Sequence, residues 1–537
     1  MFITPRSGST RPSVPAIPGW KARLLAIASI ALWLGACTGL PKGGNGPPSS
    51  AMKNVGGTAL AASVRPRVAA HPGLSGLHPL MEAQDALAAR LALADVAERS
   101  LDVQYFIWNN DMTGKVLLDR LFSAADRGVR VRLLLDDLGT MPTDDVLLTI
   151  DSHPNIEVRM FNPVAMRSLR KLGMAADFAR INKRMHNKSF TADGQIAIVG
   201  GRNIGDEYFG AHAGVNFADL DVVVIGPVVN EVSDAFDLYW NHRASIPMAS
   251  LSNRGTTPGQ FDEKRAALRA HRKVASQSQY ADIMRRSEFV GQLKRRSLPY
   301  VWGPATIVND HPDKVLTSAT DTETHLAPQL REVVDKTKRE LFLVSPYFVP
   351  GKEGVALLAN VRQRGPRVVV ITNSLASTDS ALVHSGYQRY RKDLIRAGVE
   401  LCEIKPTAAS VRKRSGGGLF GSKGAGASSG ASLHAKTFAF DRQIGFIGSY
   451  NLDPRSSRLN TEMGVLFDCP ALAKRLPEEA DRTLATTTFR VELEGDRLVW
   501  VTREGDQEVR YTSEPNASKG KRSMSWLLSL LPIEGLL

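Results

Sequence analysis

A motif of the form His-x-Lys-x-x-x-x-Asp occurs twice in this chain of 537 residues, once in each half. Other stretches recur in the same order around it. The matched pairs are residues 103–107 and 344–349, 126–138 and 363–375, 186–193 and 434–441, and 200–203 and 448–451. Chance does not produce four matches in one order. We therefore predict a tandem duplication of one folding unit.

Each half is predicted to alternate β-branched strands with amphipathic helices. The expected elements are 100–108, 114–125, 129–136, 157–161 and 220–225 in the first half, and 341–349, 353–364, 367–373, 400–405 and 463–467 in the second. This pattern predicts an α/β fold, with a mixed and largely buried sheet flanked by helices in each half. We expect two units, residues 75–310 and 311–537, related by a pseudo-two-fold axis with the active site between them.

The motif places two groups that suit phosphate chemistry on one face of a strand. Residues i and i+2 of a strand point the same way, so His186 projects with Lys188, and His434 with Lys436. If the two pairs meet, they assemble two imidazoles and two ammonium groups around one pocket. The lysines would hold the non-bridging oxygens of a phosphodiester, one imidazole would attack phosphorus, and the other would protonate the leaving oxygen.

This chemistry needs one neutral and one protonated histidine at the same pH. Carboxylates that orient the imidazoles would help, and Asp219 and Glu462 are candidates because each begins the strand after its motif. Asn203, Ser449 and Asn451 are candidates to hydrogen-bond the phosphate oxygens.

The paired motifs resemble the HKD motifs of the phospholipase D superfamily. Within it, the chain is similar to bacterial cardiolipin synthases of the C type and their lipoprotein relatives. The resemblance covers residues 75–537 and is carried by residues 100–108, 184–190, 200–210, 432–438, 448–457 and 459–464. It implies an enzyme without metal or cofactor that acts on phospholipids at a membrane surface through a covalent phosphohistidine.

The resemblance also implies roles for single residues and a reaction. The lysines would bind phosphate, whereas Asp193 and Asp441 would be mainly structural. Transfer of a phosphatidyl group to a glycerol-type acceptor would yield cardiolipin. Hydrolysis to phosphatidic acid is the alternative, and a nuclease acting on nucleic acid is a less favoured one. Two intact motifs argue against a non-catalytic scaffold.

The two halves are not equivalent, which bears on the roles of the histidines. Gly201 stands where the second half has Ser449, and the low-complexity stretch 407–432 predicts a mobile loop at the rim of the site. We expect His186 to be the nucleophile and His434 the acid and base. The reason is that basic neighbours should lower the pKa of His186, namely Arg180, Lys183, Arg184 and Lys188.

The N-terminus predicts export and lipidation. Residues 1–36 contain no acidic residue, and their apolar run is too short to span a bilayer but typical of a secretory signal. The sequence Leu-Gly-Ala before Cys37 resembles the bacterial lipobox. We therefore expect an acylated Cys37 on a membrane-anchored lipoprotein that faces the periplasm, with the outer membrane favoured and the inner membrane as the alternative. Residues 37–74 predict a flexible tether.

The charge balance suits an anionic partner. Lys and Arg number 68 against 54 acidic residues, a net charge of +14, which fits a phospholipid surface or a nucleic acid. The helical, basic stretch 250–300 predicts a solvated face, with a surface for anionic lipid as the alternative. The apolar tail 523–537 either docks into the fold or inserts at a membrane interface with Trp526 as anchor.

A few residues carry open interpretations. His384, Tyr105 and Tyr347 either line the headgroup pocket or pack in the core, and the two tyrosines occupy matching places in the two halves. Cys402 and Cys469 are expected to be free, buried thiols, with a disulfide as the alternative in an oxidising compartment.

Overall fold

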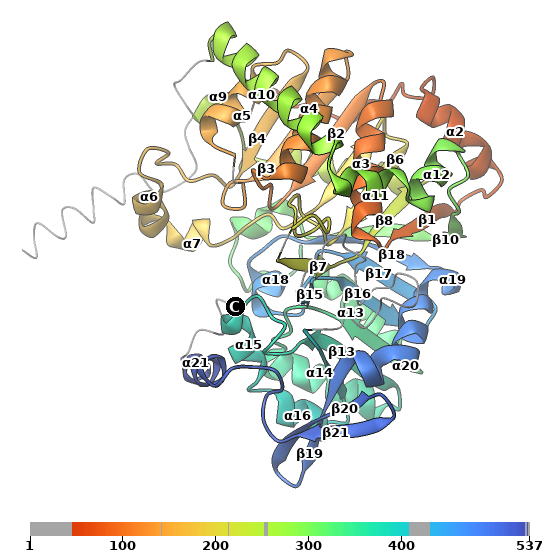
Figure 1. Cartoon of the computed structure of the whole chain (residues 1–537), viewed down its shortest axis with the longest axis vertical. Helices are drawn as coiled ribbons and strands as arrows, with labels where there is room; N and C mark the ends of the chain where they lie inside the picture. The colour runs from red at the N-terminus through yellow and green to blue at the C-terminus, as the bar shows by residue number, and fades with distance from the viewer. Residues whose placement is uncertain are drawn as a thin grey trace, which may run out of the picture.

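The computed structural model describes residues 46–140, 142–212, 214–251, 256–406, 430–531 and 534. Two α/β lobes are stacked along the long axis of the molecule, the N-terminal half above and the C-terminal half below (Figure 1). Each lobe is built on one large mixed sheet with helices on its faces. The predicted α/β fold of two tandem units is confirmed.

The first sheet has nine strands. Their order is β10 (Val301–Gly303), β1 (Ser75–Leu80), β8 (Asp221–Ile225), β6 (Ile196–Gly200), β5 (Ser189–Ala192), β2 (Ser100–Tyr105), β3 (Arg130–Asp136), β4 (Ile156–Phe161) and β9 (Ser245–Pro247). Strands β2, β3 and β4 run parallel and the other neighbours antiparallel.

The second sheet repeats this order. It runs β11 (Ala305–Asn309), β18 (Met463–Asp468), β17 (Ile444–Gly448), β16 (Lys436–Phe440), β12 (Glu340–Val344), β13 (Arg367–Asn373), β14 (Glu400–Ile404), β19 (Thr488–Glu494), β20 (Arg497–Glu504) and β21 (Gln507–Tyr511). From β11 to β19 each strand corresponds to one between β1 and β9, so the duplication extends to topology. The chain passes between the sheets at Pro304, slightly before the expected boundary at residue 310.

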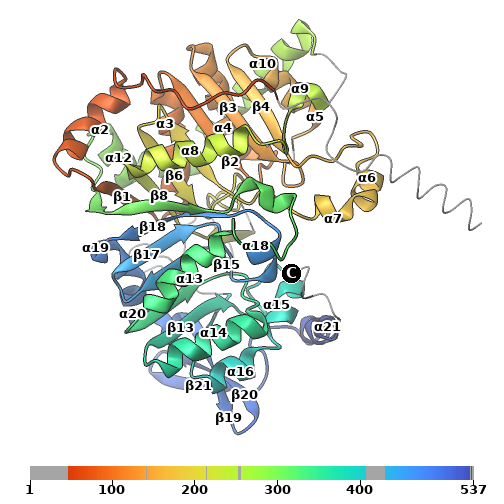
Figure 2. The same ribbon diagram turned by 180° about the vertical axis from the view of Figure 1, so that it is seen from behind.

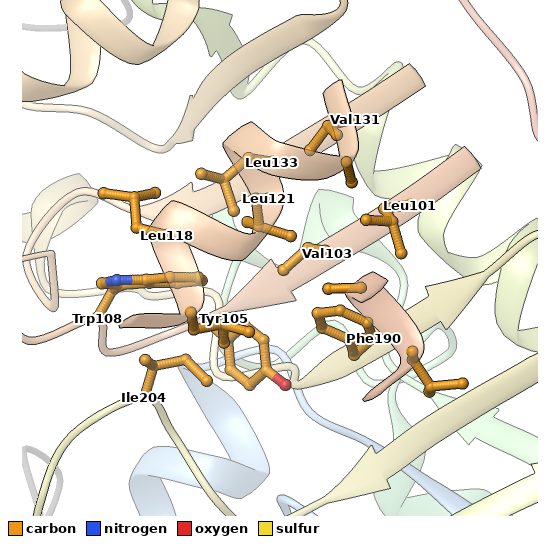
Figure 3. Close-up of a cluster of buried hydrophobic side chains, with 14 of the residues drawn as sticks. Leu101, Val103, Tyr105, Trp108, Leu118, Leu121, Val131, Leu133, Phe190 and Ile204 are labelled. Carbon is orange, nitrogen blue, oxygen red and sulfur yellow. The ribbon is translucent and has the colours of Figure 1, made fainter. Parts of the chain in front are cut away.

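Helices cover both sheets. The main ones are α3 (Ala83–Val96), α4 (Met112–Asp126), α5 (Asp144–Asp151) and α8 (Val228–Trp240) in the first lobe, and α13 (Leu326–Lys336), α14 (Gly351–Gln363), α16 (Arg391–Arg396) and α20 (Arg475–Thr487) in the second. Figure 3 shows side chains of β2, β3 and α4 converging in the first core: Leu101, Val103, Leu118, Leu121, Val131 and Leu133. This core also holds Trp108 and Ile204, whose bridge fixes two loops beside the site.

A second core joins the two lobes. It combines Val199 and Val222 of the first sheet with Ile447 and Val465 of the second. Strands β6 and β17 lie in contact across this interface. Because close-packed interiors resist deformation, this shared core holds the two halves in one fixed relation.

The predicted flexible tether is wrong for its second part. Residues 46–58 lie against the first lobe, and α2 (Ala59–Ala69) follows. The side chain of Arg132 donates to the carbonyl of Ser49 at 2.9 Å, and that of Arg159 to the carbonyl of Pro47 at 2.8 Å. Composition does not reveal this contact, because the arginines pair with Asp102 and Glu157 and use their remaining N–H groups for main-chain carbonyls of the N-terminal segment.

The basic stretch 250–300 forms the helices α10 (Pro258–Ser276), α11 (Gln279–Arg285) and α12 (Glu288–Lys294). Helix α10 packs on α4, and its Arg265 is 5% exposed. Arg265 pairs with Asp119 at 2.8 Å and also with Asp126. The interpretation as a solvated face is therefore wrong at this residue, whose charge is neutralised inside the lobe.

The N-terminal predictions fall outside the described residues. These are the signal at 1–36, the lipobox with Cys37 and the first part of the tether. Within the ranges that the structure describes, no helix is both long and apolar enough to cross a bilayer. Cys402 and Cys469 are free and buried, as expected.

Candidate active site

The two motifs meet where the lobes face each other. The N–H of His186 donates to the carbonyl of Thr461 at 2.8 Å, and the N–H of His434 donates to the carbonyl of Ala218 at 2.8 Å. The second contact extends a parallel pair between β7 (Val215–Ala218) and β15 (Gly430–Leu433). Each histidine is thus tied to the residue of the other half that precedes a candidate acid. Residues 430–432, expected in the mobile loop, belong to this pair; residues 407–429 lie outside the described part.

Each histidine is hydrogen-bonded to the carboxylate of the opposite lobe. His186 Nδ1 lies 2.8 Å from Glu462 Oε2, and His434 Nδ1 lies 2.6 Å from Asp219 Oδ2. Both carboxylates are fully buried. With Nδ1 bound to a carboxylate, Nε2 is the nitrogen left for chemistry. All four residues were predicted from the sequence, but the pairing of each histidine with the carboxylate of the other half was not.

The two lysines share the same buried pocket. Lys188 Nζ donates to the carbonyl of His186 at 2.6 Å, and Lys436 Nζ lies 3.0 Å from His434 Nδ1. Burial lowers the pKa of Lys188 to about 7 and that of Lys436 to about 8. Burial, followed by the charges of Lys188 and Lys436, lowers the pKa of His186 well below its ordinary value. These mutual effects show four basic groups in one low-dielectric site.

The two carboxylates differ in charge state. Burial raises the pKa of Glu462 to about 7, although Lys188 opposes the shift. Burial would also raise the pKa of Asp219, but His434 outweighs it and holds that pKa well below its usual value. Asp219 is therefore ionised at neutral pH, whereas Glu462 is near half protonation.

The surroundings of the acids explain why Gly201 and Ser449 differ. The hydroxyl of Ser449 donates to Glu462 at 2.5 Å, and that of Ser456 donates to it at 2.7 Å. A Cβ atom on Gly201 would lie 2.2 Å from Asp219 Oδ1, so this position has no room for a serine. Ser449 was predicted to bind phosphate, but its hydroxyl is committed to Glu462. Sequence reasoning missed Ser456.

The two asparagines lie buried beside the motifs. Asn203 Oδ1 accepts a hydrogen bond from the N–H of Ile107 at 3.1 Å, which holds the loop after β2. Asn451 is 4% exposed, and its Oδ1 has no hydrogen-bond partner among the described residues. A buried polar atom without a partner is costly, so a ligand at this position would be stabilising.

The motif aspartates lie at the far ends of the strands from the histidines. Asp193 Oδ1 accepts from the N–H groups of Arg99 at 2.8 Å and Ser100 at 2.9 Å, where β2 begins. Asp441 Oδ1 accepts from the N–H of Arg339 at 2.7 Å at the start of β12. Both aspartates adopt positive φ angles, 50° and 55°, which turn the chain after β5 and β16. They hold the strands in register and do not face the pocket.

Loss of the Asp193 carboxylate is expected to destabilise the protein without changing the chemistry. Asp193→Ala leaves the buried N–H of Ser100 and the partly buried N–H groups of Glu98 and Arg99 unpaired, which should lower the free energy of unfolding by about 2–3 kcal/mol. Asp441→Ala should cost less because the N–H groups of residues 338 and 339 are exposed. Denaturant unfolding measures both. A large loss of kcat in folded Asp193→Ala at unchanged stability would contradict the structural role.

Comparison with known proteins decides the family. The family described as "Cardiolipin synthase, PLD-like domain" matches residues 91–240 and 330–484, one segment in each lobe. The chain belongs to this family. The predicted resemblance to the phospholipase D superfamily is confirmed, as is the prediction of an enzyme.

Several relatives cover most of the chain. Cardiolipin synthase C of Escherichia coli (strain K12) is 43% identical over 479 residues, 89% of this chain and 99% of the relative. An uncharacterized protein of Helicobacter pylori (strain ATCC 700392 / 26695) is 32% identical over 470 residues, 86% of this chain and 89% of the relative. Among solved structures, the phosphatidylserine synthase of Haemophilus influenzae Rd KW20 has the same fold, with a TM-score of 0.53 at 15% identity. The match covers 86% of this chain and 95% of that one.

Three of the four basic residues expected to act on His186 face other partners. Arg184 pairs with Asp136 at 2.8 Å, Arg180 with Asp177 at 2.6 Å, and Lys183 donates to a main-chain carbonyl. Of the four, Lys188 is the one whose charge lowers the pKa of His186. The predicted direction of the pKa shift is right but its predicted cause is largely wrong, because sequence proximity does not show where side chains point.

The tyrosines do not occupy matching places. The sheets align Ser100 with Glu340, since both N–H groups bind the motif aspartate at the start of a strand. Tyr105 therefore corresponds to Ser345, not to Tyr347. The hydroxyl of Tyr105 accepts from Arg90 at 2.8 Å inside the core, while that of Tyr347 donates to Asp379 at 2.7 Å.

His384 packs inside the second lobe. Its Nε2 lies 2.8 Å from an Arg391 nitrogen and 3.6 Å from Glu514. Of the two interpretations, packing is the one that the structure supports.

Aromatic rings that were not predicted line the pocket. The ring of Phe106 lies 4.9 Å from that of His186, and the rings of Tyr208 and Phe217 lie 5.2 and 5.1 Å from that of His434. Apolar rings beside the histidines lower the local dielectric, which strengthens the electrostatic interactions within the site.

Proposed function

We propose that this chain is a phosphatidyltransferase that makes cardiolipin through a covalent phosphohistidine. One observation carries the proposal: two histidines, each bound to a carboxylate of the other lobe, share a buried pocket with two lysines. The relationship to cardiolipin synthase C of E. coli, which spans nearly all of that protein, supports phospholipids as substrates.

The proposed reaction has two halves. Nε2 of His186 attacks the phosphorus of a donor phospholipid, and the bond from phosphorus to the headgroup oxygen breaks. His434 gives its proton to that oxygen, and the headgroup alcohol leaves. His434 then takes the proton of an incoming alcohol, whose oxygen attacks phosphorus and breaks its bond to His186. Phosphatidylglycerol as acceptor gives cardiolipin, and water gives phosphatidic acid.

The division of roles follows from the difference between the carboxylates. A nucleophilic imidazole must be neutral, and burial with two nearby lysines disfavours the charged form of His186. Its partner Glu462 carries only part of a charge near neutral pH. Burial and the charge of Lys436 lower the pKa of His434, but its ionised partner Asp219 opposes this shift and so favours the imidazolium needed to protonate a leaving group. This argument supports His186 as nucleophile and His434 as acid.

The lysines would bind the phosphate. Burial is the main cause of their low pKa values, and a phosphodiester between them would raise both pKa values and favour both charges. Such fixed cations stabilise the charge that develops on the non-bridging oxygens in the transition state. The Oδ1 atom of Asn451 has no partner and would accept a hydrogen bond from the acceptor alcohol or a bound water.

The function is tested by supplying the purified protein with phosphatidylglycerol alone and resolving the products by mass. We expect cardiolipin and free glycerol, at rates unchanged by EDTA because the lysines supply the positive charge that a metal would bring. Phosphatidic acid as the main product would show hydrolysis instead. Cleavage of DNA in preference to lipid would overturn the proposal, and activity lost in EDTA and restored by one divalent ion would overturn its metal-independent form.

We also propose that the protein is a lipoprotein tethered through Cys37 and facing the periplasm, with the outer membrane favoured over the inner. The lipobox-like sequence at residues 34–37 supports this placement. The mass of the mature N-terminal peptide from membranes tests it. A peptide that begins before Cys37 or carries no acyl chain would contradict it.

A further inference from the structure

Exposed large apolar side chains gather on one helical patch in each lobe. The first-lobe patch comprises Leu169, Leu172 and Phe178 on and beside α6 (Arg170–Ala176) and α7 (Phe178–Ile181). The second-lobe patch lies on and beside α15 (Ala381–Tyr387) and α21 (Lys519–Ser529) and comprises Leu382, Met524, Trp526, Leu527, Leu530 and Leu531. Figures 1 and 2 both show these four helices on the same side of the molecule.

A helix in each patch buries a small residue and exposes large apolar ones, the reverse of what is usual for a surface helix in water. Helix α21 buries Ser525 completely but leaves Trp526 63% exposed, with Leu530 just beyond it 62% exposed. Helix α6 buries Gly173 and leaves Leu172 43% exposed. A surface helix in water normally buries its large apolar residues and exposes its small and polar ones. An apolar partner would therefore gain from covering these faces.

Specific contacts fix the orientation of α21. Gln388 Nε2 donates to the carbonyl of Ser525 at 3.0 Å, and the Ser525 hydroxyl donates to Gln388 Oε1 at 3.2 Å. Lys521 donates to the carbonyl of Thr378 at 3.3 Å. The tail therefore docks through its polar side and presents its apolar side outward. Of the two interpretations of residues 523–537, docking into the fold is the one that these contacts support.

Short chains of contacts and short stretches of backbone connect both patches to the active site. In the second lobe, α21 contacts Thr378, and the adjacent Asp379 binds Tyr347 at 2.7 Å and acts electrostatically on Lys436. In the first lobe, the chain runs from the end of α7 directly into the motif of His186. A planar apolar layer that covered both patches would therefore lie beside the active site.

Basic side chains accompany the apolar ones. They are Lys171 in the first-lobe patch and Lys519, Lys521 and Arg522 in the second, whereas Arg170 is paired with Asp137. Segment 519–529 contains no acidic residue. Apolar residues with a tryptophan and several cations match the interface of a bilayer that contains anionic phospholipid.

We propose that the two patches form one docking surface on which the protein sits against an anionic phospholipid bilayer, with the active site facing the lipid headgroups. The proposal rests on the proposed function, since it gives the active site access to substrates that stay in the membrane. Both lobes touch the bilayer, so donor and acceptor lipids could enter the pocket between them.

The test measures binding of the full chain to vesicles, with Cys37→Ser to remove the proposed acyl anchor. Vesicles contain phosphatidylcholine alone or with an equal part of phosphatidylglycerol. One double variant alters the first lobe (Leu172→Gln with Phe178→Gln) and another the second (Trp526→Gln with Leu530→Gln). The matched control alters Leu238 and Val274 to Gln; these are exposed apolar residues outside the patches. Turnover of a short-chain phospholipid below its micellar concentration reports the intact site.

We expect each patch variant to weaken binding to the anionic vesicles by about tenfold or more, with turnover of the soluble substrate within about twofold of the parent. The control should bind as the parent does. Unchanged binding in both patch variants, or an equal loss in the control, would overturn the proposal. So would dissociation of a dimer by the patch variants without loss of vesicle binding, which would assign the patches to a second copy. Parent protein that binds vesicles but never turns over phospholipid would contradict the proposed function and leave the docking surface standing.

Discussion

His186→Asn and His434→Asn are each expected to lower kcat/KM for phosphatidyl transfer by about 10³-fold or more. One change removes the proposed nucleophile and the other the proposed acid. Because the two groups act in the same step, the double variant should be little worse than either single one. A steady-state assay with phosphatidylglycerol vesicles measures all three.

A matched histidine change controls for folding. His71 stacks on Trp302 with ring centroids 4.0 Å apart, at the outer edge of the first sheet. His71→Asn should keep nearly full activity. If His434→Asn kept activity within about tenfold of the parent on phosphatidylglycerol, a single pocket with two cooperating histidines would be ruled out.

Asp219→Asn is expected to be more harmful than Glu462→Gln, although each removes a carboxylate bound to a motif histidine. Asp219 is ionised and supports the charged form of His434, so its loss should lower the pKa of His434. Less His434 is then protonated at neutral pH, and the alkaline limb of the kcat profile should move to lower pH by about one unit or more, with kcat at pH 7 falling about 10²-fold. Glu462 carries only part of a charge near pH 7, so Glu462→Gln should cost about tenfold.

Double-mutant cycles test whether each motif histidine is coupled to the carboxylate of the other lobe. His434→Asn and Asp219→Asn should be strongly non-additive, because each disrupts the same hydrogen-bonded pair, and so should His186→Asn and Glu462→Gln. Strong coupling of His434 with Glu462, which lies in the same half of the chain, would contradict the geometry. Thermal unfolding of each variant separates these effects from loss of the folded protein.

Much of the fold could be predicted from the sequence because the duplicated motifs share order and spacing. The alternation of strands and helices is set by local periodicity, which is why β2, β3, β13 and α14 fall close to their expected ranges. The pairing of His186 with Lys188 follows from strand geometry alone.

The parts that could not be predicted depend on contacts between distant segments. The carbonyls of Ala218 and Thr461 place each histidine beside the other lobe, and no local pattern encodes that. The hydroxyl of Ser449 donates to Glu462 because the fold places that carboxylate within hydrogen-bond distance. The binding of residues 46–58 by Arg132 and Arg159 likewise depends on the folded first sheet, so local sequence does not predict it.

The most direct test of the account is to find which residue carries the phosphatidyl group. His434→Asn is mixed with a phosphatidyl p-nitrophenyl ester, whose leaving group needs no proton, and digested under conditions that spare phosphohistidine before mass spectrometry. The account predicts a phosphatidyl adduct on His186 in this variant and no adduct in His186→Asn. An adduct on His434 in His186→Asn would reverse the roles, and the absence of any adduct in both variants would contradict the covalent step.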